Sequence, residues 1–375
     1  MHSQKKQHKN LMEDKETSEK QKINTNGGLT KKQLESQKEV GVSYWSLVKH
    51  QFRKNMLAMF SMYIVIFLIF VALTADFLSS SKPLYASYKG ETYFPVIKDY
   101  LNDIGISKWS PDMINVNWKQ LDNENKLESV VWTPVPYGSR EIDLKNSLSP
   151  PRGDHYLGTD AIGRDLLAGL IHGSRVSLSV GFIAAGIALL IGIALGSMAG
   201  YYGGKVDLLV MRFVEIMMTL PTFFLIITIV AIYGSSIWYI MAAIGFTSWT
   251  GDAKLIRGEV LKVRNMEYIT AANSIGFSGK QIIFRHVIPN AIAPVLVSGA
   301  FAIAGAILTE AALSFLGFGV SATTVTWGSL LNEARGASNA WWLAIFPGLM
   351  IFIAVVTYNL IGEGLRDALD PRLRD

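Results

Sequence analysis

The chain has 375 residues, a net charge of +5 and no cysteine; half of its residues are hydrophobic and only 17% are charged. This composition excludes an intrinsically disordered protein and favours a membrane protein with several spans. Because cysteine is absent, disulfide bridges and thiolate-bound metals are excluded.

The N-terminal part is polar and basic. The first 55 residues contain twelve Lys and Arg against six acidic residues. We predict that residues 1–42 form a disordered cytoplasmic tail. We interpret the basic excess as a signal of membrane orientation rather than as a nucleic-acid site. The first apolar run begins near Leu57, too far from the N-terminus for a cleavable signal peptide.

Six apolar runs follow, and each is roughly long enough for a helix that crosses a hydrocarbon core of about 30 Å. The six predicted spans are Leu57–Leu78, Val176–Tyr201, Leu208–Tyr233, Ile237–Trp249, Ala291–Leu316 and Trp341–Ile361. The fourth run is short, and we expect its helix to continue through Asp252 and Lys254 at the interface. The predicted fold is therefore an all-α membrane protein with six transmembrane helices.

The positions of basic residues predict the orientation of these spans. Lys49, Arg53 and Lys54 precede the first span and place the N-terminus in the cytoplasm. Six crossings return the C-terminus to the same side. The basic residues expected there are Lys262, Arg264, Lys280, Arg285, Arg366, Arg372 and Arg374. The predicted regions are a cytoplasmic approach with the first span (43–78), an extracellular segment (79–165) and a core of five further spans (166–375) with a cytoplasmic loop (252–290).

The extracellular segment is rich in aromatic residues and prolines rather than low in complexity. We predict a small packed cap. The aromatic residues in question are Tyr93, Phe94, Tyr100, Trp109, Trp118 and Trp132. Two roles are open for it: contact with an external binding protein, or a structural lid over the helices.

The segment Leu157–Asp165 reads LGTDAIGRD. Its glycines allow tight turns, and Asp165 is placed to cap an amphipathic run, Leu166–Gly173, at the outer interface. Its acidic and basic residues are expected to pair with one another or with a binding protein, and a structural turn-and-anchor role is favoured. The candidate site residues are Gly158, Thr159, Asp160, Gly163, Arg164 and Asp165.

Glycines recur every four residues in the second span, at Gly192, Gly196, Gly200 and Gly204. Small residues at this period let two helices approach closely in lipid. We expect either generic close packing or a specific contact, within the chain or with a second membrane subunit. Pro221 in the third span predicts a kink, which is a candidate for a gating hinge or a static bend.

Between the fourth and fifth apolar runs lies the polar, basic stretch Glu267–Asn290. We predict two short helices, the first capped by Asn265 and ended by Gly276. Ser278 and Gln281 form a capping box for the second helix, which is expected to run to Pro289. Glu267 lies favourably near the start of the first helix dipole. Ala271 and Ala272 are expected to leave a shallow surface for another chain.

Glu310 lies inside the fifth apolar run, and an ionisable group at membrane depth is a candidate for a functional site. It is a possible gating residue, or it lies near the headgroups or against a partner residue. No phosphate-binding loop, metal-ligand spacing or catalytic constellation is visible, so we predict neither an enzyme nor a cofactor.

Two motifs resemble those of a known family. Ala271, Ala272, Gly276 and Ile288-Pro289 resemble the E-A-A…Gly…Pro loop of bacterial ABC-importer permeases, although Thr270 replaces the motif's glutamate and Glu267 stands three residues earlier. The segment Leu157–Asp165, continuing through Gly173–Leu178, resembles the C-type subunit of oligopeptide, dipeptide and nickel permeases. The resemblance covers roughly residues 43–375.

The resemblance implies a subunit of a type I ABC importer in the bacterial plasma membrane. The implied partners are a B-type permease, two ATP-binding subunits, an extracellular substrate-binding lipoprotein and the lipid bilayer, with no nucleic acid. It implies that Glu267, Ala271, Ala272, Gly276 and Ser278 couple the chain to the ATPase.

The cargo expected from the resemblance is an oligopeptide or dipeptide, with nickel or a metal chelate as the alternative. A secondary transporter or channel would be expected to show inverted repeats or an ion-coordinating pair of broken helices. No convincing halves are visible in the sequence.

Overall fold

The computed structural model describes residues 44–103, 105–110, 113, 116–321 and 323–369. The predicted tail of residues 1–42 and the basic residues Arg372 and Arg374 lie outside this part. The chain divides into two compact units after Gln51. The described part of the first unit is the start of α3 (Tyr44–Lys54), and the second unit contains all other elements.

Four helices of the described chain are long and apolar enough to cross a membrane: α4 (Met56–Leu73), α8 (Leu166–Tyr202), α16 (Ala293–Phe315) and α18 (Trp341–Leu369). A fifth candidate consists of α9 (Gly204–Thr219) and α10 (Thr222–Tyr233), which meet at an angle of 84°. The predicted first span is shorter than expected, because Thr74 ends α4 and the four-residue helix α5 (Ala75–Leu78) follows.

The bend between α9 and α10 lies at Pro221. Proline has no N–H for the helical ladder and its ring obstructs the preceding turn, so α9 ends at Thr219 and α10 restarts at Thr222. The predicted kink at Pro221 is confirmed, and it is a full break of 84° between two helices.

The fourth apolar run forms α11 (Ile237–Ser248), which at 12 residues is too short to be a span alone. Trp249 has helical backbone angles and leads directly into α12 (Thr250–Arg264). The expected continuation through Asp252 and Lys254 is therefore confirmed.

Helix α8 begins ten residues before the predicted start of the second span. Asp165 caps it, because the Oδ1 atom accepts a hydrogen bond from the Ala168 amide at 2.8 Å. The cap is confirmed, whereas the separate interfacial run Leu166–Gly173 is wrong. These residues are the buried first two turns of the long helix, since they pack beneath α17 (Trp327–Glu333).

The segment between α4 and α8 is ordered but not purely helical. It forms a three-stranded antiparallel sheet in the order β2-β1-β3, with Ala86 of β1 opposite Tyr93 of β2 and Val130 of β3. Trp118 is only 2% exposed and its ring lies 5.9 Å from that of Tyr93. The packed cap is confirmed, but the all-α description does not hold for this segment. Its elements are β1 (Tyr85–Tyr88), β2 (Glu91–Tyr93), α6 (Pro95–Asp103), α7 (Trp118–Asn123), β3 (Ser129–Val131) and a 3-10 turn (Leu144–Asn146).

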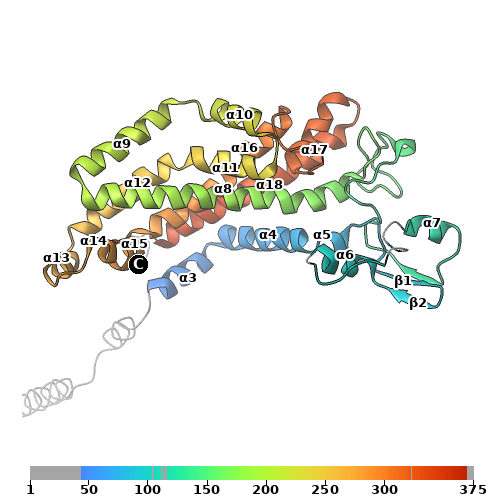
Figure 1. The fold of residues 1–375 in the computed structure, drawn as a ribbon, viewed down its shortest axis with the longest axis horizontal. Helices are drawn as coiled ribbons and strands as arrows, with labels where there is room; N and C mark the ends of the chain where they lie inside the picture. The colour runs from blue at the N-terminus through green and yellow to red at the C-terminus, as the bar shows by residue number, and fades with distance from the viewer. Residues whose placement is uncertain (1–43, 104, 111–112, 114–115, 322, 370–375) are drawn as a thin grey trace, which may run out of the picture. The chain divides into compact units, whose positions relative to one another are not determined.

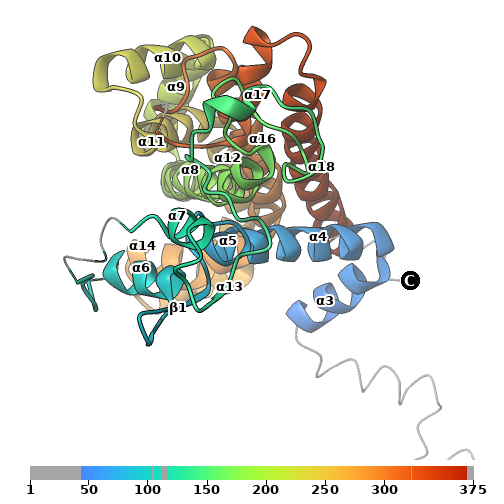
Figure 2. The same ribbon diagram turned by 90° about the vertical axis from the view of Figure 1, so that its right-hand side faces the viewer.

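Within the second unit, α8 is the central helix and contacts α4, α11, α12 and α16 (Figure 1). Figure 2 shows α18 and α10 on opposite sides of α8 and α16. Three glycines of the predicted ladder face α12: a Cβ at Gly192, Gly196 or Gly200 would collide with atoms of Asp252–Val260. The ladder is therefore a contact within the chain, and Gly204, which begins α9, takes no part in it.

This contact yields a prediction with a matched control on the same helix. A Cβ at Gly196 would overlap Ile256 and the Ala253 carbonyl, whereas one at Gly186 would meet nothing within 4 Å. Gly196→Ala is expected to reduce the free energy of unfolding by about 1–3 kcal/mol through overpacking. Gly186→Ala is expected to leave it unchanged or raise it by about 0.5–1 kcal/mol, because alanine favours the helix.

The measurement is the thermal unfolding midpoint of each purified variant in the same detergent. Equal midpoints for the two variants would contradict close packing of α8 on α12 at Gly196.

Candidate functional site

The first candidate site is the stretch Met266–Ile288 between α12 and α16, which we call the knob. It contains α13 (Glu267–Ser274), α14 (Gly279–Ile282) and a π-helical turn (Ile283–Val287), followed by α15 (Ile288–Ala291). Two short helices were predicted here, and α13 and the α14 turn begin at the expected places.

The predicted cap at Asn265 is wrong. Asn265 has near-helical backbone angles and ends α12, with its amide bonded to the Lys262 carbonyl at 3.3 Å. The extended residue before α13 is Met266, which has no side-chain cap. An N-cap needs an extended backbone, and Asn265 is instead the C-cap of the preceding helix.

Gly276 ends α13 as predicted, with a left-handed φ of +89°. Around it the Gly276 amide bonds to the Asn273 carbonyl at 3.0 Å and the Phe277 amide bonds to the Ala272 carbonyl at 3.2 Å. These bonds satisfy carbonyls that the helix end would leave free. The capping box of Ser278 and Gln281 is also confirmed. These local bonds thus fix the turn between α13 and α14.

The underside of the knob is apolar and buried. Ile269, Ala272 and Ile282 pack on Val260 and Val263 of α12. The predicted shallow surface of two alanines is therefore half wrong. Ala272 is on the same helical face as Ile269 and is only 6% exposed, so Ala271 alone remains on the surface.

The second helical part does not end at Pro289. Pro289 lies in the first turn of α15, directly after the π-helical turn Ile283–Val287. The chain stays helical from Gly279 to Ala291 and, after Ile292, continues as α16. The knob is consequently joined directly to two long helices, α12 and α16.

The outer face of the knob carries exposed apolar side chains beside basic ones. Ile275 is 76% exposed and Phe284 is 73% exposed. Exposed apolar groups rimmed by polar residues are typical of a protein-binding surface. The exposed residues of this face are Met266, Glu267, Tyr268, Ala271, Ile275, Phe277, Ser278, Lys280, Phe284 and Arg285.

Two long-range contacts attach the region around the knob to neighbouring helices. Arg257 of α12 forms two short bonds with the carboxylate of Asp207 on α9, at 2.5 and 2.6 Å. The Tyr201 hydroxyl at the end of α8 lies 3.4 Å from Asn273. Sequence analysis missed both contacts. Partners 50 and 72 residues apart leave no local spacing signal.

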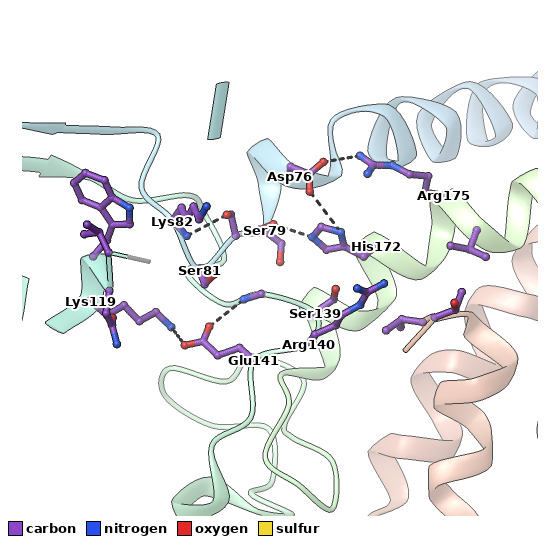
Figure 3. Close-up of a pocket in the computed structure, with 18 residues that line it drawn as sticks. Asp76, Ser79, Ser81, Lys82, Lys119, Ser139, Arg140, Glu141, His172 and Arg175 are labelled. Carbon is purple, nitrogen blue, oxygen red and sulfur yellow. Dashed lines mark hydrogen bonds and ion pairs between the residues drawn. The ribbon is translucent and has the colours of Figure 1, made fainter. Parts of the chain in front are cut away.

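The second candidate site is at the opposite end of α8, where a polar cavity of about 950 Å³ lies beneath the sheet-bearing segment (Figure 3). Asp76 is placed between two side chains of α8: its carboxylate lies 2.9 Å from Arg175 and 3.8 Å from His172. His172 also reaches the Ser79 carbonyl at 2.9 Å. These contacts fasten the segment after α4 to the start of α8.

The charge of Asp76 is maintained by its neighbours. Burial alone raises the pKa of the Asp76 carboxyl, but hydrogen bonds with Tyr100 and Arg175 and the positive charge of Arg175 outweigh that effect. The net pKa therefore lies below its ordinary value, and the carboxylate remains ionised. Sequence analysis named neither Asp76 nor His172 as a site residue, since 96 positions separate Asp76 from His172 in the chain.

The Leu157–Asp165 segment lies near this end of α8 and consists of linked turns. The Asp160 carboxylate accepts hydrogen bonds from the Ile162 and Arg164 amides at 2.9 Å and pairs with the Arg164 side chain. Arg164 reaches Glu333 of α17 at 3.0 Å. Asp165, besides capping α8, lies 2.8 Å from His155.

The remaining motif residues fit into tight surroundings. Gly158 and Gly163 both have positive φ, and a Cβ at Gly163 would overlap the Asp143 backbone. The Thr159 carbonyl accepts a hydrogen bond from the Trp342 indole at 3.0 Å, which joins the motif to α18. The motif thus connects three helices, α8, α17 and α18.

Glu310 faces partner residues rather than headgroups. It is 1% exposed, and its Oε1 atom accepts hydrogen bonds from Ser314 at 2.6 Å and Thr326 at 2.9 Å. Its Oε2 atom has no partner in the described part of the chain. Thr326 caps α17, so Glu310 anchors that helix. Glu310 and Pro221 were both candidates for gating. Within the described part of the chain, no hydrogen bond joins them.

Helix α17 lies between the fifth and sixth predicted spans, where no helix was predicted from the sequence. Trp327 at its start is fully buried and donates its indole N–H to the Leu170 carbonyl at 3.1 Å. Thr326 is a residue type favoured at an N-cap, and its side chain accepts a hydrogen bond from the Ser329 amide, so it was the one local signal for this helix.

The chain is similar to known transport proteins. Residues 192–375 match the family described as binding-protein-dependent transport system inner membrane component, and residues 43–95 match the N-terminal TM domain of oligopeptide transport permease C. The inner membrane ABC transporter permease protein YejE of Escherichia coli (strain K12) is 34% identical over 328 residues, which cover 86% of this chain and 95% of that protein.

Two further relatives differ in their coverage. The peptidoglycan transport system permease protein YejE of Agrobacterium fabrum is 30% identical over 351 residues, covering 86% of this chain and 91% of that protein. The dipeptide transport system permease protein DppC of Alkalihalophilus pseudofirmus is 41% identical over 235 residues, covering 62% of this chain and 77% of that protein.

Proposed function

Because the chain belongs to the family of inner membrane components of binding-protein-dependent transport systems, we propose that it is the C-type permease subunit of an ABC importer for peptides. The transporter would also contain a B-type permease, two ATP-binding subunits and an extracellular substrate-binding lipoprotein. This subunit supplies half of the membrane path, and the ATPase partners supply the chemistry.

The proposed topology has six crossings, with both termini and the knob in the cytoplasm. Helices α11 and α12 together supply the fourth crossing. Their combined length of about 40 Å, at 1.5 Å per residue, exceeds a hydrocarbon core of about 30 Å. Lys262, Lys280 and Arg285 near the knob support this orientation through the positive-inside bias. Residues 79–165 and α17 then lie outside.

The observation that carries the proposal is the shape and surface of the knob. Two helical turns are fixed at an angle by Gly276 and by the Ser278 capping box, and they present Ile275 and Phe284 to solvent. Such a rigid apolar projection fits a cleft on a partner ATPase. Glu267, Ala271, Gly276 and Ser278 lie on or beside the exposed face, while Ala272 acts by holding α13 on α12.

The knob is placed to transmit motion into the membrane. Closure of the ATPases would move it as a rigid body, and α12 and α16, joined to its two ends, would carry the movement into the spans. The 84° bend at Pro221 is the proposed hinge between α9 and α10. The transporter would then alternate between two packings of its helices, one open to each side.

The proposed cargo is a peptide, as in the dipeptide permease relative. A cell-wall peptide is the second candidate. Coverage supports this second candidate. A relative named for peptidoglycan transport matches 86% of this chain, whereas the dipeptide permease matches 62%. The chain therefore shares more than the permease core with the former.

Uptake in a strain that lacks this chain tests the proposal. Radiolabelled trialanine, a radiolabelled cell-wall tripeptide and ⁶³Ni²⁺ are supplied separately, with and without the restored gene. We expect restored uptake of at least one peptide and no change for Ni²⁺, together with co-purification of an ATPase with the tagged chain. Gene-dependent uptake of Ni²⁺ alone, or purification without any ATPase, would overturn the peptide-importer proposal.

A further inference from the structure

A further cavity lies within the helix bundle, between α8, α11, α12 and α16, and has a volume of about 370 Å³. Its walls are mostly apolar, but they contain one carboxylate and three hydroxyl groups. The polar lining residues are Ser248, Asp252, Ser298 and Thr309. Polar groups at membrane depth normally face protein or a water-filled path rather than lipid.

Asp252 is the only acidic residue of this lining. It is 6% exposed, and one of its oxygens accepts a hydrogen bond from Ser298 at 2.5 Å. Within the described residues it forms no ion pair with a lysine, arginine or histidine. A buried carboxylate without a counter-charge is costly, and a cation that enters the cavity would relieve that cost.

The cavity is also located where the knob would act. Asp252 is on α12, which leads into α13, and Ser298 is on α16, which follows α15. The back wall is close-packed, because a Cβ at Gly192 of α8 would lie 2.7 Å from the Asp252 Cβ. Movement of the knob would therefore change the distance between Asp252 and Ser298 against a fixed α8.

We propose that this cavity receives the N-terminal ammonium group of a peptide during its passage, with Asp252 as the residue that attracts it; this rests on the proposed peptide cargo. An ammonium group has three N–H donors and needs acceptors for each. The Asp252 carboxylate and the hydroxyls of Ser298 and Ser248 supply them at one end of the cavity. Thr309 is eleven residues beyond Ser298 on α16, about 16 Å away at 1.5 Å per residue, and takes no part. The volume suits one or two amino-acid residues rather than a whole oligopeptide.

Because the native chain contains no cysteine, a single introduced thiol is the only labelled position on this chain, and labelling is read on this chain after it is separated from its partners. Ser248→Cys is made in the full chain, in the assembled transporter in membranes. It is treated with cationic 2-aminoethyl or anionic 2-sulfonatoethyl methanethiosulfonate. The cationic reagent is expected to react about tenfold faster than the anionic one, because a negatively charged cleft concentrates cations. Adding Asp252→Asn is expected to remove this preference.

Phe246→Cys is the matched control, since Phe246 is on the same helix, is 57% exposed and does not line the cavity. Its reagent preference should not respond to Asp252→Asn. Trialanine is expected to slow labelling at Ser248→Cys, and N-acetyl-trialanine, which lacks the ammonium group, is not.

The outcomes separate this inference from the proposed function. A thiol at position 248 that reacts with neither reagent, or a preference unaffected by Asp252→Asn, would overturn the ammonium site. Equal protection by both peptides would do the same. Absence of peptide uptake by the wild-type transporter would instead refute the cargo, while the reagent preference still reports whether Asp252 attracts cations.

Discussion

Valine in place of Gly276 is expected to lower ATP-driven uptake at least about tenfold while hydrolysis by the assembled transporter continues. Gly276 has a φ of +89°, which a β-branched residue adopts only at a cost of about 1–3 kcal/mol. A Cβ there would meet nothing within 4 Å, so the penalty is conformational rather than steric. The turn would relax, and α14 would lose its fixed angle to α13.

Gly276→Asn is the control for this variant, because asparagine tolerates the left-handed region far better than valine does. It should retain most of the uptake. The measurement is ATP-dependent uptake and ATP hydrolysis in the same proteoliposomes. Normal coupling in the valine variant would show that the knob is not a rigid lever. Equal losses in both variants would show that any side chain at this position blocks docking.

The second large effect that we expect is a loss of stability when the Glu310 side chain is removed. Glu310→Ala should lower the free energy of unfolding by about 3 kcal/mol, because it leaves the hydroxyls of Ser314 and Thr326 without their acceptor and opens a small cavity. Glu310→Gln should stay within about 1 kcal/mol of wild type, since its amide oxygen can replace Oε1. The amide nitrogen then takes the place of the partnerless Oε2 atom.

Thermal unfolding of the purified variants measures the first expectation, and peptide uptake distinguishes anchoring from gating. As an anchor of α17, Glu310 can be replaced by glutamine with near-normal uptake. A glutamine variant with wild-type stability and lost uptake would assign the charge itself to gating. A stable alanine variant would contradict the anchoring role.

Several features were predictable because the interactions that create them are local. The Asp165 cap, the Gly276 stop and the Ser278–Gln281 box all join residues within five positions of one another. The proline break behaves similarly, since the missing N–H of Pro221 acts on its own helical turn. Where a local signal competed with a neighbouring helix, as at Asn265, the prediction was wrong.

Other features depend on which helix lies beside which. The Glu310–Thr326, Asp252–Ser298 and Arg257–Asp207 contacts join residues 16 to 50 positions apart. The prediction that Ala271 and Ala272 are both exposed was wrong for the same reason, because packing on α12 buries Ala272. No periodicity in a single sequence predicts these long-range contacts.

The sequence by itself determined which stretches form apolar helices and where the chain turns at Pro221 and Gly276, because hydropathy, caps and glycine conformations act over one or two turns. Tertiary structure alone decided the 84° bend angle, the partner of the glycine ladder and the burial of Asp252 beside Ser298. Those outcomes follow from close packing between elements distant in the chain, and packing depends on the simultaneous shape of all the surfaces involved.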